Sequence, residues 1–238
     1  MDHELKEQQE FYDDTWRKSL DEGTENRGNL QANLQFLQET DLLKKSDKIL
    51  EIGCGTGSLV NELKKKGFNI TGTDISQEAI AYGLKKYGDI KLSVQPAEQL
   101  PFPDGSFNVV LSFDLFEHIA RVDKHVSEVV RVLTPDGYYL LQTPNKYSSA
   151  FYSTYVCKSL KWRRAHPSLH SPGQLKRRLK KHGFQTIKFV KMNIKNEFAA
   201  AKFKQTGLFG RLYQHLNFAK LPLCLQTNLY VAAQKGKS

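Results

Sequence analysis

The sequence predicts an α/β domain built on a mostly parallel sheet of seven strands, with helices on both faces. Two observations support this prediction. Short apolar segments alternate along the chain with longer segments that are apolar at every third or fourth residue. Helices of this length between strands indicate βαβ units, whose right-handed crossovers place successive strands in parallel. At 238 residues the chain is long enough for one domain with a substantial core.

Two helices are expected before the sheet, at residues 4–20 and 27–43. Tyr12, Trp16 and Leu20 recur at every fourth position of the first helix. Residues at this spacing share one helix face, and such a face usually packs against the domain. The stripe is therefore expected to be a packing surface rather than a ligand contact.

The first half of the sheet begins with a buried strand at residues 48–53, a short apolar run that ends at a glycine. The helix after it, residues 58–67, is apolar on one face and also stops at a glycine. Residues 68–74 are the expected second strand. Ser76 is a favourable N-cap for the helix at residues 76–88.

The third strand, residues 90–95, alternates apolar and polar residues. A loop rich in Pro, Gly and Asp separates it from a fourth, apolar strand at residues 107–113. An amphipathic helix follows at residues 123–133. A Thr-Pro-Asp-Gly turn then leads into the fifth strand, residues 138–144.

The last part of the chain closes the predicted sheet. A helix is expected at residues 171–183, because Ser171 is its N-cap, proline stands at the first helical position and Gln174 completes a capping box. Two strands, residues 184–192 and 227–234, follow it. The fold is therefore expected to carry an N-terminal helical extension and C-terminal helical insertions.

Charge divides the chain unevenly, although the net charge is only +10. The N-terminal helical cap, residues 1–44, and the core, residues 45–145, together hold 16 Lys and Arg against 24 Asp and Glu. The remaining region, residues 146–238, holds 19 Lys and Arg against a single acid, Glu197. This asymmetry indicates that the last region meets an anionic partner.

No segment indicates secretion or a membrane span. The N-terminus is acidic and polar, with no apolar h-region, and no apolar run approaches the roughly 20 residues that a span needs. Cys54, Cys157 and Cys224 match no metal-ligand spacing and form no disulfide framework. A cytoplasmic protein without a metal is expected.

The glycine-rich stretch "ILEIGCGTG" indicates where a ligand binds. Gly53, Gly55 and Gly57 directly follow the first strand, at the carboxyl edge where open parallel sheets bind ligands. Nicotinamide and flavin sites use G-x-G-x-x-G, and here the third glycine comes one residue early. A pyrophosphate gains nothing from Glu51, whereas a ligand with an amine and a sulfonium does. No Gly-Lys-Ser/Thr follows, which excludes a P-loop.

The pattern E-x-G-x-G-x-G resembles the cofactor loop of class I S-adenosylmethionine-dependent methyltransferases. Asp74 ends the second strand, 21 residues after Gly53, where that family has the acid that binds both ribose hydroxyls. Residues 94–119 and 131–145 resemble the type 11 subgroup, which includes quinone-biosynthesis enzymes. The resemblance covers roughly residues 45–145 and implies a Rossmann-like fold and S-adenosyl-L-methionine as cofactor, with S-adenosyl-L-homocysteine as its product.

The resemblance also implies residue roles. Glu51 would orient the amino-acid end of the cofactor, Asp74 would hold the ribose and Ile75 would pack on the adenine. Phe113 would lie near the sulfonium. Many relatives have Asp where this chain has Pro96, which removes the usual carboxylate bond to the adenine amino group. The full set of expected cofactor-binding residues is Glu51, Gly53, Cys54, Gly55, Gly57, Asp74, Ile75, Ala97, Glu98 and Phe113.

The implied reaction is an in-line SN2 transfer of a methyl group to an O, N, C or S nucleophile. A general base is needed only where the acceptor must lose a proton. His118, just beyond the fourth strand, and His170, just before the helix at 171–183, are the candidate catalytic residues, and His166 is a weaker one. A structural histidine that bonds a backbone carbonyl is an equally good interpretation of His118.

The acceptor is expected to be a small molecule or a lipid-linked intermediate. The segment after the fourth strand, "SFDLFEH", differs from the Asn/Asp-Pro-Pro-Tyr of enzymes that methylate adenine or glutamine, and no Pro-Cys nucleophile is present. Two alternatives stay open. One is a methyltransferase for RNA or another nucleic acid that uses the basic last third. The other is a cofactor-binding protein without turnover.

Two segments of the basic region, residues 148–164 and 207–220, carry aromatic and aliphatic stripes beside Lys and Arg. Such a face suits a helix that lies in the interface of an anionic bilayer. The competing interpretation is that both stripes face the core and cover the active site. The sequence thus predicts peripheral binding to an anionic membrane surface, with nucleic acid as the less favoured partner.

Overall fold

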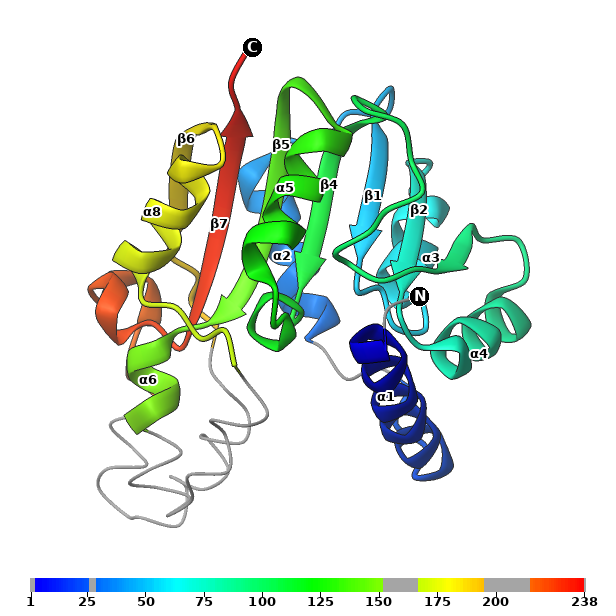
Figure 1. Ribbon diagram of the computed structural model, residues 1–238. Coiled ribbons are helices and arrows are strands. Elements are labelled where there is room, and N and C mark those ends of the chain that lie inside the picture. The colour runs from blue at the N-terminus through cyan, green and yellow to red at the C-terminus, as the bar shows by residue number, and fades with distance from the viewer. Residues whose placement is uncertain (1–2, 26–28, 152–166, 195–214, 238) are drawn as a thin grey trace.

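The computed structural model describes residues 3–25, 29–151, 167–194 and 215–237, and they fold around one seven-stranded sheet (Figure 1). The strand order is β3-β2-β1-β4-β5-β7-β6, and β7 is antiparallel to both of its neighbours. The strands are β1 (Lys48–Ile52), β2 (Asn69–Asp74), β3 (Leu92–Val94), β4 (Phe107–Phe113), β5 (Leu133–Pro144), β6 (Phe184–Val190) and β7 (Asn228–Lys235). The predicted α/β fold with a seven-stranded, mostly parallel sheet is confirmed.

Helices cover both faces of the sheet. The α-helices are α1 (His3–Asp21), α2 (Leu30–Thr40), α3 (Ser58–Lys65), α4 (Gln77–Tyr87), α5 (Val122–Val132), α6 (Lys146–Phe151) and α8 (Pro172–Lys181). Three short 3₁₀ turns, η1 (Phe116–His118), η3 (Phe218–Lys220) and η4 (Leu223–Leu225), complete the described elements. No helix in the described part of the chain is long and apolar enough to cross a membrane.

Alternation along the strands builds two apolar layers. Leu50 and Ile52 of β1 point to the face covered by α5 and α8, whereas Ile49 points to the face covered by α2 and α3. Because successive side chains of a strand point to opposite faces, a strand that is apolar at every position must be covered on both sides. The nearly continuous apolar runs in the sequence reflect this double coverage.

The fifth strand begins earlier than the sequence predicts. Leu133 pairs with Phe107 and Tyr138 pairs with Val109, so residues 134–137 bulge opposite the single residue Asn108. Asp136, in this bulge, has a φ of 58°. The Thr-Pro-Asp-Gly segment turns as expected, but it does so inside β5 because β4 continues to pair on both sides of it.

The strand order reverses between β1 and β4, which lie side by side at the centre of the sheet. The connections leave these two strands toward opposite sides, and the crevice between them at the carboxyl edge is where open α/β sheets bind ligands. Helix α1 lies at this edge of the sheet (Figure 1). The glycine loop after β1 and the ends of β2 and β4 all meet there.

Candidate functional site

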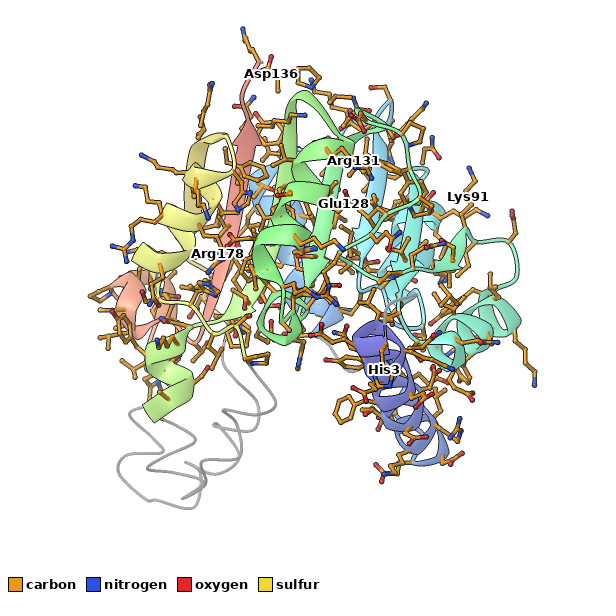
Figure 2. All side chains as sticks on the ribbon, in the orientation of Figure 1. His3, Lys91, Glu128, Arg131, Asp136 and Arg178 are labelled. Carbon is orange, nitrogen blue, oxygen red and sulfur yellow. The ribbon has the colours of Figure 1, made fainter. Side chains whose placement is uncertain are left out.

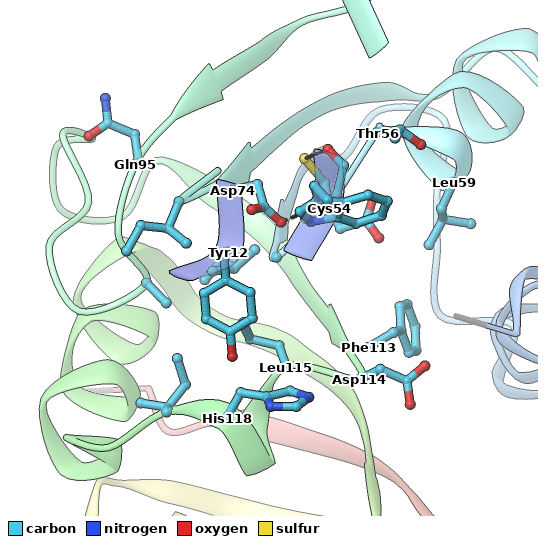
Figure 3. Close-up of a pocket in the computed structure, with 18 of the residues that line it drawn as sticks. Tyr12, Cys54, Thr56, Leu59, Asp74, Gln95, Phe113, Asp114, Leu115 and His118 are labelled. Carbon is cyan, nitrogen blue, oxygen red and sulfur yellow. Dashed lines mark hydrogen bonds between the residues drawn. The ribbon is translucent and has the colours of Figure 1, made fainter. Parts of the chain in front are cut away.

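A pocket occupies this carboxyl edge, and Figure 3 shows its walls. The glycine loop, the ends of β2 and β4, the segment after β3, and helices α1 and α2 all contribute to it. Most of the expected cofactor-binding residues line it: Glu51, Gly53, Cys54, Gly55, Asp74, Ile75, Ala97, Glu98 and Phe113. Gly57 stands outside the lining, where it is the N-cap of α3 with a φ of 76°. The sequence motifs therefore converge on one place in the fold.

Two positions of the glycine loop leave no room for a side chain. Gly53 and Gly55 have φ angles of 75° and 54°, in the left-handed region that favours glycine. A Cβ on Gly53 would lie 2.9 Å from Leu115 Cδ1, and a Cβ on Gly55 would lie 2.6 Å from Trp16 Cζ2. The loop therefore lacks side chains at the two positions where Leu115, after β4, and Trp16 of α1 pack against it.

The Asp74 carboxylate joins the second strand to this loop. Its Oδ2 accepts the backbone N–H of Gly55 at 2.8 Å, and its Oδ1 accepts the backbone N–H of Ser76 at 2.9 Å. Burial raises the pKa of Asp74, and these N–H bonds oppose the rise. A carboxylate has about four acceptor sites, so these bonds still leave it able to accept from a ribose hydroxyl.

Glu51 is the clearest sign of a bound cation. Its side chain is 5% exposed, and within the described part of the chain its Oε2 has no hydrogen-bond partner. Burial first, and the charge of Asp74 second, raise the pKa of this carboxyl group well above its usual range. A ligand ammonium beside Oε2 would satisfy the buried oxygen and compensate its charge. Glu51 therefore fits the amino-acid end of S-adenosylmethionine.

Glu98 brings a carboxylate into the pocket near Pro96, the position at which the sequence lacks one. It is 2% exposed and lines the pocket, and among the described residues nothing hydrogen-bonds to its Oε2. Burial raises its pKa. Pro96, two residues earlier, has no carboxylate, so Glu98 is the residue of this loop that offers the pocket a carboxylate oxygen.

Helix α1 closes the pocket, which the sequence did not indicate. Tyr12 and Trp16 both line it, and Figure 3 shows Tyr12 projecting into it. Asp13 Oδ1 accepts the Ser76 hydroxyl at 2.6 Å and the Glu78 backbone N–H at 3.1 Å, which fastens α1 to α4. The spacing of Tyr12 and Trp16 indicates a packed face, but it cannot say that a ligand lies beneath that face.

The end of β4 brings Asp114 and His118 to the same pocket (Figure 3). Asp114 has a φ of 50°, its backbone N–H donates to Gln142 Oε1 at 2.8 Å, and it was not among the predicted site residues. His118 makes an edge-on contact with the Tyr12 ring, with 6.1 Å between ring centroids. Its Nε2 lies 3.9 Å from Oε1 of the buried Glu117. Asp114 directly follows the central strand β4, and this position in the sequence could have identified it as a candidate site residue.

His170 lies outside the pocket. Its Nδ1 donates to the Ser168 carbonyl oxygen at 2.6 Å, and its Nε2 accepts from Arg178 Nε at 3.1 Å. Burial, with a smaller effect of the Arg178 charge, lowers the pKa of this histidine, which favours its neutral form. Both ring nitrogens are therefore engaged, and the structure does not bring His170 together with His118 and the cofactor residues.

His170 instead lines a second cavity, between α5 and α8. We call this cavity the basic groove, because one acid, Asp123, faces five cationic side chains there: Arg121, Lys124, Arg177, Arg178 and Lys181. Most of the two amphipathic stripes predicted at 148–164 and 207–220, together with His166 and Cys157, lies outside the described residues. Three of these cations, Arg177, Arg178 and Lys181, come from the strongly basic last region, and Arg121 and Lys124 come from the start of α5.

Comparison with known proteins assigns the fold and site to a class. The family model of the type 11 methyltransferase domain matches residues 50–141, the segment that holds the glycine loop, Asp74 and the end of β4. This segment is the core of a class I S-adenosylmethionine-dependent methyltransferase domain of type 11. The resemblance predicted from the motifs and the cofactor it implies are confirmed.

The similar proteins extend this result. A probable S-adenosylmethionine-dependent methyltransferase of Mycolicibacterium smegmatis is 33% identical over 41% of this chain and 38% of that protein. A demethylmenaquinone methyltransferase of Chlorobaculum parvum is 36% identical over 40% of this chain and 39% of that protein. The chain thus spans about two fifths of the length of these curated relatives. A methyltransferase structure from Thermotoga maritima, described as a possible histamine N-methyltransferase, shares the fold over 95% of this chain and 97% of that one, with a TM-score of 0.65 and 20% identity.

Proposed function

We propose that the protein transfers a methyl group from S-adenosylmethionine to a small-molecule or lipid-linked acceptor. The observation that carries this proposal is the buried Glu51 carboxylate, whose Oε2 has no hydrogen-bond partner among the described residues, beside a glycine loop that Asp74 binds. When bound, S-adenosylmethionine supplies an activated methyl carbon on its sulfonium. Glu51 would hold the ammonium, Asp74 the ribose hydroxyls and Glu98 the adenine amino group.

The chain's own contribution is chiefly alignment and exclusion of water. Trp16 and Tyr12 of α1 close the pocket on one side, and Phe113 and Leu115 form its floor at the end of β4. Holding two reactants in line can lower a barrier by roughly 7–11 kcal/mol. We assign His118 as the general base for an acceptor that must lose a proton, because it lines the pocket. His170, with both nitrogens engaged, would position Arg178 in the basic groove.

Acceptor chemistry differs among the similar proteins. One is a demethylmenaquinone methyltransferase, and a fatty-acid O-methyltransferase of Mycolicibacterium smegmatis also matches, with 33% identity over 48% of this chain. Both names denote hydrophobic acceptors. Together with the net charge of residues 146–238 and the basic groove, they support an acceptor that the protein meets at an anionic membrane surface.

Two measurements test the proposed function. Calorimetry should show that S-adenosylhomocysteine binds and that NAD does not. A cell extract incubated with the protein and methyl-labelled S-adenosylmethionine should then yield a labelled product, identified by mass. Binding without any labelled product from extracts or vesicles would favour a cofactor-binding protein without turnover.

A further inference from the structure

The pocket is unusually acidic for a cofactor that carries one net positive charge. Four carboxyl groups line it, those of Glu51, Asp74, Glu98 and Asp114, and no Lys or Arg among the described residues does. S-adenosylmethionine brings an ammonium, a sulfonium and a carboxylate. The first three carboxyl groups already have a role toward that ligand, whereas Asp114 has none. Uncompensated negative charge in a buried site favours a further cation.

Asp114 is held in place by the surrounding chain. The Gln142 side chain and the backbone N–H of Asn29, just before α2, lie close enough to its carboxyl group to oppose the rise in pKa that burial causes. The φ of 50° at Asp114 directs the chain sharply after β4, at the end of the pocket where Phe113 and His118 also lie (Figure 3). A carboxylate has about four acceptor sites, so these two neighbours leave some of them open to a ligand.

A second observation at the same wall points to a hydrogen-bond donor. Asn33 lies in the first turn of α2 and donates its backbone N–H to the carbonyl oxygen of Asn29, the N-cap, at 3.0 Å. The Asn33 side chain is 6% exposed and lines the pocket, and its Oδ1 has no hydrogen-bond partner in the described part of the chain. Burying such an oxygen is costly unless a ligand donates to it. At this side of the pocket, Asn33 Oδ1 needs a hydrogen-bond donor and the Asp114 carboxylate needs a positive charge.

We infer that the methyl acceptor presents an amine nitrogen, which binds as an ammonium between the Asp114 carboxylate and Asn33 Oδ1. This inference rests on the proposed function and names the substrate class of that same site. An ammonium supplies both the charge and several N–H donors. An alcohol of the same shape supplies one donor and no charge.

Methyl transfer to the amine requires that the nitrogen first loses a proton. The bound ammonium gives one proton to His118, which lines the same end of the pocket. The freed nitrogen lone pair forms a bond to the methyl carbon, and the electrons of the broken carbon–sulfur bond remain on sulfur. The product is a methylated ammonium, which keeps its positive charge beside Asp114. Asp114 and Asn33 bind the acceptor, and His118 acts as the base.

The buried carboxyl group of Glu117, three residues after Asp114, fits this arrangement. Glu117 accepts a hydrogen bond from Thr143 Oγ1 at 3.1 Å, and burial together with the charge of Asp114 raises its pKa to about 8. Burial raises the pKa of Asp114 as well, so the two carboxyl groups compete for one proton. A cation beside Asp114, the member of the pair that lines the pocket, favours its ionised form and leaves the proton on Glu117. The pair thus presents one charge to the acceptor.

A binding experiment that needs no turnover tests the inference. The protein is saturated with S-adenosylhomocysteine and titrated with benzylamine and with benzyl alcohol, which have the same shape. We expect the wild type to bind the amine roughly 10–100-fold more tightly than the alcohol, because a charge-assisted bond replaces a neutral one. Asp114→Asn should abolish that preference, and Asn33→Leu should weaken amine binding while the alcohol is little affected.

Asparagine also tolerates the left-handed conformation, so Asp114→Asn is expected to fold. Asp136→Asn is the matched control, because Asp136 has a similar φ of 58° but is exposed in the bulge at the other end of β5. Equal affinity for the two probes, no amine binding at millimolar concentration, or a preference that survives Asp114→Asn would overturn the inference.

Different results would contradict the proposed function and the amine inference. Loss of S-adenosylhomocysteine binding, or absence of any labelled product, would remove the proposed function itself. A labelled product from extract that carries its new methyl group on oxygen or carbon would overturn only the amine inference. A product methylated on nitrogen, formed much more slowly by Asp114→Asn than by Asp136→Asn, would support both.

Discussion

Asp74 Oδ2 accepts the backbone N–H of Gly55 at 2.8 Å, so the end of β2 and the glycine loop after β1 form one rigid unit. The same carboxylate lines the pocket. A single side chain therefore shapes the loop and faces the ligand. Structural and binding effects of Asp74 can be separated, because one appears in stability and the other in ligand affinity.

Asp74→Ala should weaken binding of S-adenosylhomocysteine by roughly 1.5–3 kcal/mol, since it removes charge-assisted bonds to the ribose. It should also lower the free energy of unfolding, because the Gly55 N–H loses its partner. Calorimetry and thermal unfolding measure the two effects. Asp89→Ala, just before β3, removes only an exposed ion pair with Lys64, so it should leave ligand affinity unchanged and stability nearly so. Unchanged ligand affinity in Asp74→Ala would remove Asp74 from the binding site.

The contact between Gly55 and Trp16 predicts a coupled pair. Gly55→Ala places a methyl group 2.6 Å from Trp16 Cζ2 at a φ of 54°. Alanine in the left-handed region costs about 1–2 kcal/mol by itself, and the overlap should add about 1–3 kcal/mol. Gly105→Ala, with a φ of 62° and no neighbour closer than 4.0 Å, shows the first cost alone.

Trp16→Ala should remove the overlap and recover most of the additional cost of Gly55→Ala. Chemical unfolding of the two single variants and the double variant gives the coupling energy. Additive effects, with Gly55→Ala no worse than Gly105→Ala, would show that α1 does not lie over the glycine loop.

Much of this architecture is readable from the sequence. The positions of all seven strands follow from apolar runs between glycine and proline signals, and Ser171 with Gln174 forms the predicted capping box around α8. The cofactor residues were readable because a short motif supplies several of them together. Local spacing thus predicts the elements and the loop that joins β1 to α3.

Contacts between distant segments could not be predicted in the same way. Tyr12 and Trp16 reach the pocket only because α1 folds across the carboxyl edge, and Asn33 does so because α2 packs beside β4. Their spacing is that of ordinary packed helices. His170 looked equivalent to His118, and only the fold shows that Ser168 and Arg178 engage both of its nitrogens.

Glu117 predicts a pH dependence of stability. Its pKa of about 8 in the fold exceeds its ordinary value of 4.5, so the folded state binds the proton more tightly than the unfolded state. This contribution to stability is fully present below pH 4.5 and is lost as the pH rises toward 8. Glu117→Gln should therefore raise the melting temperature at pH 8.5 by about 2–4 °C for each kcal/mol gained, and change it little at pH 5.

Thermal unfolding of the wild type and Glu117→Gln at pH 5, 7 and 8.5 measures this difference. Glutamine retains an acceptor for Thr143 Oγ1, so the hydrogen bond at 3.1 Å can persist. A difference between the two proteins that stays the same at all three pH values would show that Glu117 does not titrate in this range.

The two histidines should behave differently on mutation. His118→Ala should lower turnover by about 10²–10⁴ for an acceptor that must lose a proton, with little change in S-adenosylhomocysteine affinity. His170→Ala should instead reduce stability by roughly 1–3 kcal/mol, because the Arg178 and Ser168 groups lose their partner. Rates are compared at saturating acceptor and equal folded fraction. Equal rates in wild type and His118→Ala would exclude His118 as the base.

The basic groove should contribute to binding of an anionic surface. Lys124 and Arg177 line it without an ion pair to the acids of the described chain, whereas Arg178 is bound to Asp123 at 2.7 Å. Each basic residue near an anionic bilayer is worth about 1 kcal/mol. Lys124→Glu with Arg177→Glu reverses two such charges and should weaken binding to anionic vesicles by more than tenfold, roughly the effect of 2 kcal/mol or more.

Lys85→Glu with Lys91→Glu is the matched control, because it makes the same change in net charge at two exposed positions, in α4 and just before β3. Figure 2 shows Lys91 on the opposite side of the molecule from Arg178. Co-sedimentation with anionic and neutral vesicles at low and high salt measures the effect. We expect salt-sensitive binding to anionic vesicles only, lost in the groove variant and kept in the control. Indifference to both vesicle types, combined with tight binding of RNA that the groove variant loses, would instead identify the groove as a nucleic-acid contact, since phosphate binding accounts for the same charges.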